Sequence, residues 1–237
     1  MTKMASGAVL ALTMTLGATA HAQGVAKPYA TMAPLDQYLM DRAAEAALAK
    51  SAAPPSISDN ATILVLTAKG YETVAKGKNG FTCLVERSWM SPFDFPEFWN
   101  PKMRGPICYN PPAVRSVLPG TIKRTDLVLK GLTKPALLAA IKTEVAKTRL
   151  GMPELGSMSY MLSPHQYLND KGQAWAPHMM FYAGRSDAAA WGANLPGSPI
   201  MLDDDHTLTP EPQSTFMMMA SAWSDGTPYV KGQGHGH

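Results

Sequence analysis

The sequence predicts a single α+β domain, residues 34–230, with a mainly antiparallel sheet packed by two or three helices. Three observations lead to this fold class. Helical spacing of apolar residues prevails in the first part of the chain. From Ser157 onward, short apolar runs alternate with turn residues, as in core strands. Between these parts, Asn79-Gly80 is typical of a β-hairpin turn, because both residues tolerate positive φ.

The chain begins with MTKMASGAVLALTMTLGATAHAQG, which has the layout of a secretory signal peptide. Lys3 precedes an apolar stretch over residues 8–17, and Ala20-His21-Ala22 forms a small-x-small cleavage site. A membrane-spanning helix needs about 20 apolar residues, and no segment reaches that length. We therefore expect residues 1–22 to be removed near Ala22, and the protein to be periplasmic or secreted, with no transmembrane segment.

The amino-acid composition limits the kinds of partner that we expect the protein to bind. The 237 residues carry a formal net charge of +3, which becomes +2 when Lys3 is lost with the signal peptide. A chain so close to neutral gives no reason to expect nucleic acid as a partner. Because 46% of the residues are hydrophobic, the mature chain can bury a sizeable core. We expect residues 23–33 to form an N-terminal leader and residues 231–237 a flexible Gly- and His-rich tail.

The first predicted helix covers residues 34–51, with Pro34 in its first turn and Leu35, Tyr38 and Leu39 at helical spacing. Prolines at 54 and 55 cannot continue it. Residues 61–67 are continuously apolar and β-branched, as in a buried strand. The segments 71–75 and 81–87 flank Asn79-Gly80, so we expect them to pair as a hairpin.

The later elements follow from the same patterns. Residues 113–131 have helical Leu and Val spacing, but Pro119-Gly120 should kink or divide the helix. A further helix is predicted over residues 132–151, with Thr133 as its cap and Gly151 at its end. The predicted strands after it are SMSYMLS (157–163), APHMMFYA (176–183), SPIML (198–202) and STFMMMASAW (214–223).

The chain has two cysteines, Cys83 and Cys108. In an oxidising compartment two cysteines usually form one bridge, and neither belongs to a CxxC redox motif. A disulfide between them would close a loop of about 25 residues and stabilise the fold by roughly 3–4 kcal/mol. We predict a structural disulfide. The alternative, a Cys-His nucleophile, would leave the other thiol free in that compartment.

The segments GKNGFTCLVERSW and PICYN, followed downstream by YMLS, PHMMFY and WSDG, resemble a family of exported bacterial proteins with no assigned activity. The resemblance covers most of the mature chain. It implies an exported, single-domain protein, and no reaction, ligand or catalytic residue.

Catalytic candidates are dispersed. His165, His178, His206 and Asp205 carry side chains that suit acid–base or metal chemistry. They show no recognised ligand spacing, and the chain has no HExxH, GxSxG, GxGxxG or P-loop motif. Each histidine could equally be a hydrogen-bonded structural residue or an exposed loop residue. We predict no cofactor.

Two further features could bind a partner. The tail residues His235 and His237 could hold divalent copper, nickel or zinc loosely, although we predict no metal site. The proline-stiffened segment SPFDFPEFWNP presents aromatic side chains that suit recognition. These candidate binding residues are Phe93, Phe95, Phe98 and Trp99. The interpretation that we favour is that the rings fold inward as a small core beneath the loop.

Together these features favour an exported, non-catalytic module that binds a small molecule or an envelope protein. The alternatives are a hydrolase-type enzyme that uses the dispersed histidines and aspartates, and a metal-handling protein. Whether the chain is an enzyme stays open, with the balance of motifs against it.

Overall fold

The computed structural model describes residues 29–147, 150–171, 175–193, 195–198, 200–201 and 209–230. Its centre is one eight-stranded sheet with the order β2-β1-β3-β4-β5-β6-β8-β7. Every pair of neighbouring strands is antiparallel except β1 and β3. The predicted single α+β domain with a mainly antiparallel sheet is therefore confirmed. The strands are β1 (Thr62–Thr67), β2 (Gly70–Ala75), β3 (Thr82–Glu86), β4 (Gly105–Tyr109), β5 (Met158–Met161), β6 (His178–Gly184), β7 (Ile200–Met201) and β8 (Gln213–Met219).

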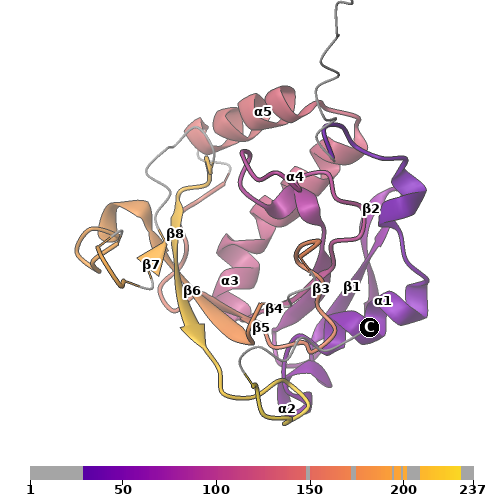
Figure 1. Ribbon diagram of the computed structural model, residues 1–237, viewed down its shortest axis with the longest axis vertical. Helices are drawn as coiled ribbons and strands as arrows, with labels where there is room; N and C mark the ends of the chain where they lie inside the picture. The colour runs from indigo at the N-terminus through magenta and orange to yellow at the C-terminus, as the bar shows by residue number, and fades with distance from the viewer. Residues whose placement is uncertain are drawn as a thin grey trace, which may run out of the picture.

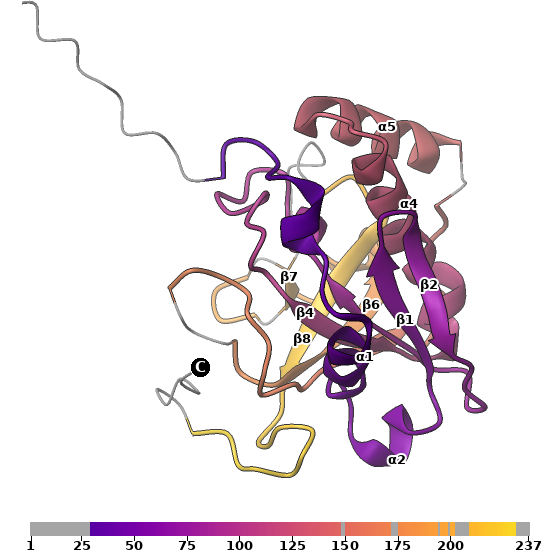
Figure 2. The ribbon, with the colours of Figure 1, turned by 90° about the vertical axis from the view of Figure 1, so that its right-hand side faces the viewer.

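Five α-helices lie in the described residues, more than the two or three expected. They are α1 (Arg42–Lys50), α2 (Pro55–Ser58), α3 (Pro111–Ser116), α4 (Leu118–Leu129) and α5 (Lys134–Ala146). In Figure 1, α3 and α4 lie between β1 and β2 on one side and β6 and β8 on the other. Figure 2 shows α5 at one end of the molecule and α2 at the other. The curved sheet thus holds α3 and α4 against one face.

The two faces of the central strands build two different cores. Along β3, Cys83 and Val85 pack with residues of α1 such as Ala49. Leu84, between them, packs instead with Val117 and Leu118 beside α3 and α4. This separation follows from the period of a strand, because successive side chains point to opposite faces. Charged residues on the α3–α4 face of β3 therefore point toward α4.

The first predicted helix is divided. A 3-10 helix spans Leu35–Tyr38, and α1 begins after Asp41. The Asp41 side chain accepts hydrogen bonds from the amides of Ala43 and Ala44 at 3.0 and 2.9 Å, so it is the N-cap of a new helix. Before this, Tyr29, Met32 and Ala33 of the predicted leader already pack against the core.

The predicted hairpin between residues 71–75 and 81–87 is wrong. The strand β2 pairs with β1, and β3 pairs with β1 and β4. Gly80 does adopt a positive φ of 77°. However, the Asn79 side chain donates to the Ile57 carbonyl at 2.8 Å, and its oxygen accepts from the Phe81 amide. The first bond fastens the turn to the segment before β1, and the second is internal to the turn, so β3 pairs with β1 rather than with β2.

The predicted division near Pro119 is confirmed, since α3 and α4 meet at Val117 and Pro119 lies in the first turn of α4. A proline is tolerated there because the first amides of a helix have no partner within it. The next helix, α5, ends at Ala146, well before Gly151. Its Leu137 and Ile141 are buried, as the apolar spacing predicts.

The predicted disulfide is present. Cys83 and Cys108 lie directly opposite each other on β3 and β4, with their Cα atoms 3.9 Å apart. Both side chains are fully buried. The bridge therefore joins the two strands at the base of the loop, residues 87–104.

Three of the four rings of the aromatic loop are buried in the structure, as the favoured interpretation predicts. Phe93, Phe98 and Trp99 are at most 4% exposed and belong to a core cluster with Trp89. Trp99 packs edge-on against Phe98, with ring centroids 4.7 Å apart. Phe95 alone among the four candidates keeps partial exposure. The rings fold inward because their contact with the core removes more apolar area from water than an open loop would.

A buried ion pair joins this core to the sheet. Arg87 Nη2 lies 2.7 Å from Glu45 Oε2, and both side chains are fully buried. Glu45 Oε1 also accepts from the Leu66 amide, and Arg87 Nε donates to the Tyr38 carbonyl. Such a pair is tolerated because hydrogen bonds satisfy both partners. Among the described residues, no helix is long and apolar enough to cross a membrane.

Candidate functional site

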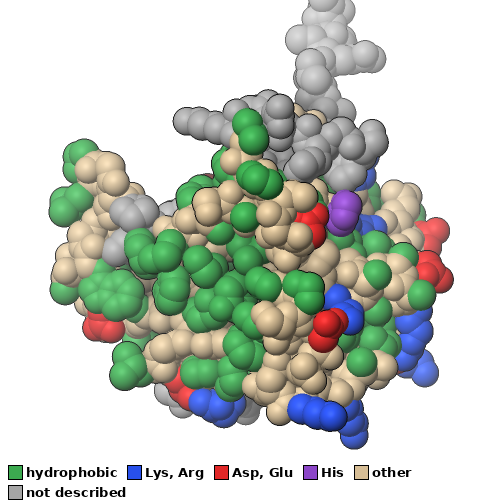
Figure 3. Space-filling model, turned by 90° about the horizontal axis from the view of Figure 1, so that it is seen from below, with side chains coloured by type: hydrophobic (Ala, Val, Ile, Leu, Met, Phe, Trp, Pro, Cys, Tyr) green, Lys and Arg blue, Asp and Glu red, His purple; other side chains and the backbone are tan. Residues whose placement is uncertain are grey.

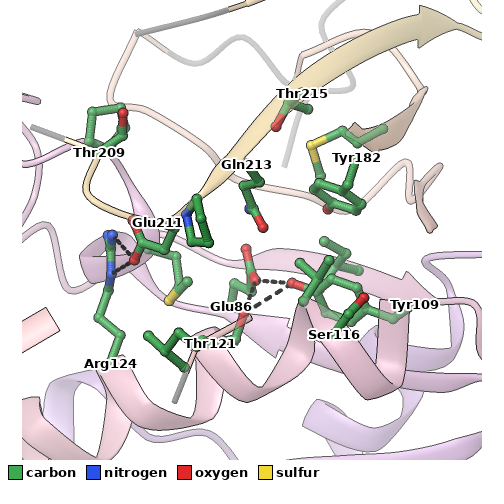
Figure 4. Close-up of a pocket in the computed structure, with 18 of the residues that line it drawn as sticks. Glu86, Tyr109, Ser116, Thr121, Arg124, Tyr182, Thr209, Glu211, Gln213 and Thr215 are labelled. Carbon is green, nitrogen blue, oxygen red and sulfur yellow. Dashed lines mark hydrogen bonds and ion pairs between the residues drawn. The ribbon is translucent and has the colours of Figure 1, made fainter. Parts of the chain in front are cut away.

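A cavity of about 690 Å³ lies between α4 and the strands β3, β4, β6 and β8. Its described lining comes from segments far apart in the sequence: the end of β3, the loop after it, β4, the α3–α4 helices, residues 150–151, β6 and the segment from Thr209 into β8. Figure 4 shows Glu86, Tyr109 and Thr121 on one side of the space, facing Gln213 and Thr215 on the other. The volume suits a small organic molecule, since ligand pockets are about 300–1,000 Å³.

Strand register brings Glu86 and Tyr109 together. Tyr109 pairs with Thr82 and Gly105 with Glu86, so these side chains share one face of β3 and β4. The long Tyr109 side chain reaches along that face, and its hydroxyl donates to Glu86 Oε1 at 2.6 Å. Thr121, from α4, lies 3.2 Å from the same oxygen and 3.1 Å from the Tyr109 hydroxyl. Residues of β4 and α4 therefore hold the carboxyl group that Glu86 extends from β3.

Glu86 has an unusual electrostatic environment. Burial raises the pKa of its carboxyl above 4.5, against the opposing effects of the Tyr109 and Thr121 hydrogen bonds and the Arg124 charge. Burial, together with the Glu86 charge, raises the pKa of Tyr109 well above 10. Both hydroxyls contact Oε1, and no described residue donates to Oε2. Because Glu86 lines the cavity, Oε2 is the carboxyl oxygen that it can offer to a ligand.

Arg124 and Glu211 close one end of the cavity, as Figure 4 shows. Arg124 donates from Nε and Nη2 to Glu211 Oε1, and from Nη1 to the carbonyls of Trp89 and Ser91, both at 3.0 Å. Its guanidinium carbon also lies 4.7 Å from the centre of the Phe93 ring. The Arg124 side chain is only 3% exposed. It therefore fastens the start of β8 to α4 and has little surface to offer a ligand.

The remaining lining is largely apolar with a few hydroxyls. Tyr182, in β6, stacks near Tyr109 with ring centroids 6.4 Å apart. Its hydroxyl is 2.8 Å from Ser159 Oγ, and burial raises its pKa. Ile107, Val117 and Met180 add apolar surface. A ligand that fits here needs an apolar body and at least one polar group that can reach Glu86.

A second hollow of about 460 Å³ is lined by Phe181, Trp191, Phe216 and Met218. Phe181 and Phe216 are paired across β6 and β8, with ring centroids 6.0 Å apart. Figure 3, which views the molecule from below, shows hydrophobic side chains gathered over the left and centre of that face. None of its four described lining residues is titratable, so none of them could orient a ligand through a charge. It is a weaker candidate than the cavity beside Glu86.

The structure does not bring the predicted histidines to the cavity. His165 is exposed in a turn, where its amide donates to Ser163 Oγ at 3.1 Å. His178 is 1% exposed, with Nδ1 2.8 Å from the Ala176 carbonyl, and burial lowers its pKa. His178 is thus a hydrogen-bonded structural residue at the start of β6. Neither lines the cavity.

The other candidates lie outside the described residues: Asp205, His206, His235 and His237. Within the described ranges, no group of three or more His, Cys, Asp or Glu side chains could hold a metal ion.

The sequence reasoning missed Glu86, Tyr109, Thr121, Arg124 and Glu211. One signal was available. Glu86 is a carboxylate at the end of the apolar run FTCLV, and it shares the alternating face of Leu84 rather than that of Cys83. A charge on the buried face of a strand requires partners or a function. The partners themselves come from α4 and β8, which only the pairing of the strands brings close.

Comparison of the chain with protein-family models, with curated proteins and with solved structures gives no match. The resemblance to an exported family therefore stays a prediction, and the function must be argued from the residues of the cavity.

Proposed function

We propose that the protein is an exported, non-catalytic module that binds a small molecule in the cavity between α4 and β8. The observation that carries this proposal is Glu86, whose carboxyl group is fixed by two hydroxyls through Oε1 and which lines a cavity of about 690 Å³. Binding sites of this kind are largely preformed, mostly apolar, and contain a few polar groups that orient the ligand. The described lining has each of these properties.

Export is supported by two features. The N-terminal residues have the layout of a signal peptide. The disulfide between Cys83 and Cys108 is of a kind that forms and persists mainly in oxidising compartments. We infer that the mature protein acts in the periplasm or outside the cell. Binding a ligand there requires no nucleotide cofactor.

Gly120 allows a direct test. It lies in α4 on the cavity wall, and a Cβ there would contact nothing within 4 Å. Gly120→Phe should therefore fill part of the cavity, while Gly120→Ala adds one methyl group to the same helix position. Each protein would be incubated with the low-molecular-mass fraction of a bacterial extract, and retained compounds identified by mass spectrometry after gel filtration.

We expect wild type and Gly120→Ala to retain the same compound and Gly120→Phe to lose it, with all three showing the same circular dichroism spectrum. Equal retention by all three would place the ligand elsewhere. If folded wild-type protein retained nothing, the binding proposal would be wrong.

A second function has one observation in its favour. Glu86 has a raised pKa, and both Glu86 and Glu211 have an oxygen with no donor among the described residues. Two carboxyl groups in different environments can serve as a general acid and its partner in hydrolysis. This enzyme would use Glu86 rather than the dispersed histidines. Turnover of chromogenic glycosides or esters by wild type, abolished in Glu86→Gln, would favour it over simple binding.

A further inference from the structure

The charges of the described lining are not balanced. Three carboxyl groups line the cavity, those of Glu86, Asp94 and Glu211, with one cationic side chain, Arg124. Arg124 is bound to Glu211, so these two charges compensate each other. Asp94 is exposed at the mouth and interacts with the charge of Lys134. Glu86 remains as the carboxyl group without an ion-pair partner among the described residues.

The carboxylate oxygens that receive no hydrogen bond also indicate that the described lining lacks a positive charge. Every nitrogen of the Arg124 guanidinium already donates to a carboxylate or a carbonyl, so Arg124 is poorly placed to bind an anion. In contrast, Oε2 of Glu86 and Oε2 of Glu211 receive no hydrogen bond from a described residue. A group that offers N–H donors and a positive charge would complement these atoms, whereas a carboxylate or phosphate would be repelled.

The surface around Glu86 suits an organic cation rather than a hydrated metal ion. Tyr182, 7% exposed, and the partly exposed Met180 supply the apolar wall, whereas Tyr109 and Ile107 are at most 2% exposed and offer little surface. Aromatic faces attract organic cations, and the apolar wall would hold the body of such a ligand. No metal-holding cluster occurs in the part of the chain that the structure describes.

We propose that the cavity selects a small monovalent organic cation, an amine or guanidine joined to an apolar body, whose N–H groups bind Glu86 Oε2. This rests on the proposed function, because it names the chemical class of the ligand for the same cavity. The cation supplies the charge that the described part of the lining lacks, and the apolar body fills the space between α4, β6 and β8.

The proposal fixes how affinity depends on pH. Burial raises the pKa of Glu86, so part of the empty protein still carries a neutral carboxyl above pH 4.5, the ordinary pKa of such a group. A bound cation favours the ionised form, so binding releases a proton in that range, and affinity increases as the pH rises through the pKa of Glu86. The other charged or titratable groups near this carboxyl are Arg124 on α4, Tyr109 on β4, Tyr182 on β6 and Tyr71 on β2. The three tyrosines stay neutral in that range, because burial raises their pKa values further.

Isothermal titration with matched probes tests the charge. Phenethylamine, 2-phenylethanol and phenylacetate have the same ring with a cationic, neutral or anionic head, and hexylamine, hexanol and hexanoate repeat the series with a linear body. We expect wild type to bind an amine at least tenfold more tightly than its alcohol and acid. Glu86→Gln should lose at least tenfold in amine affinity. Asp94→Asn, the same chemical change at the mouth, should lose less than threefold.

The outcomes separate this inference from the binding proposal. Tighter binding of the alcohols or acids, or an unchanged amine affinity in folded Glu86→Gln, would overturn the cationic class and leave small-molecule binding intact. If no probe binds, the charge of the compound retained from the extract decides: a cation supports the inference, and a neutral or anionic compound refutes it. A protein that retains nothing at all refutes both proposals.

Discussion

Removal of the disulfide should weaken both the fold and the cavity. In the double variant Cys83→Ala/Cys108→Ala, the chain between β3 and β4 loses its covalent closure, and two buried sulfur atoms leave the core beside α1. The two cysteines are separated by 25 positions in the sequence. Closing a loop of that length restricts the unfolded chain, so loss of the bridge stabilises the unfolded state.

The size of the effect follows from the loop length. In the chain-entropy relation, a loop of about 25 residues corresponds to about 3.5 kcal/mol at 25 °C. For a domain of this size each kcal/mol moves the melting temperature by about 2–4 °C, so we expect a fall of roughly 7–14 °C. The lost sulfur contacts add to this in the alanine variant. Wild type reduced with dithiothreitol keeps both sulfur atoms and isolates the effect of the covalent link.

Urea unfolding at 25 °C, followed by circular dichroism, would measure the free energy of unfolding of oxidised wild type, reduced wild type and the double variant. Glu86 and Tyr109 lie on the bridged strands, so affinity for the retained ligand should fall in parallel. A loss of less than about 1 kcal/mol on reduction would refute the loop-closure reasoning. An unchanged ligand affinity would show that the bridge does not brace the cavity.

Three further outcomes are expected. Trp99→Ala, which removes a core ring packed on Phe98, should destabilise the protein by about 3–5 kcal/mol in urea unfolding, and a loss under 1 kcal/mol would contradict its burial. Glu45→Gln leaves the buried Arg87 without its ion-pair partner and should cost about 3–5 kcal/mol, measured in the same way. Because the pKa of Glu86 is raised in the folded state, the free energy of unfolding should fall as the pH rises from about 4.5 through that raised value. Glu86→Gln should remove this pH dependence of the free energy of unfolding, and it should be more stable than wild type above the raised pKa. An unchanged pH dependence of the melting temperature in Glu86→Gln would contradict its assignment to Glu86.

Individual helices and strands could be predicted from the sequence where one clear pattern indicated them. The continuous apolar run 61–67 became β1, and the periodic apolar face of residues 132–151 became α5 with Leu137 and Ile141 buried. The disulfide followed from the number of cysteines. Asn79-Gly80 misled because the Asn79 side chain donates to the Ile57 carbonyl, in the segment before β1, and this contact directs the chain toward β1. Sequence spacing does not reveal such a contact.

The cavity was beyond sequence reasoning for a different reason. Its polar residues come from β3, β4, α4 and the start of β8, so their meeting depends on strand order and register. The aromatic loop drew attention because its composition suits recognition, yet the same rings suit a core. Phe98 and Trp99 entered the core because the disulfide and the Arg124 hydrogen bonds to Trp89 and Ser91 hold the loop close to α4.

Alternation along β3 explains how one short strand can brace the fold and present a binding group. Cys83 and Val85 face α1, so the disulfide lies on one side of the sheet, while Leu84 and Glu86 face α4 and the cavity. The bridge joins directly opposed residues and so fixes the register of β3 against β4. A slip of two residues would keep every side chain on its own face but would change the distance along the strands between Glu86 and Tyr109, on which their hydrogen bond depends. In the proposed site the disulfide would therefore act through strand position, without any contact between sulfur and ligand.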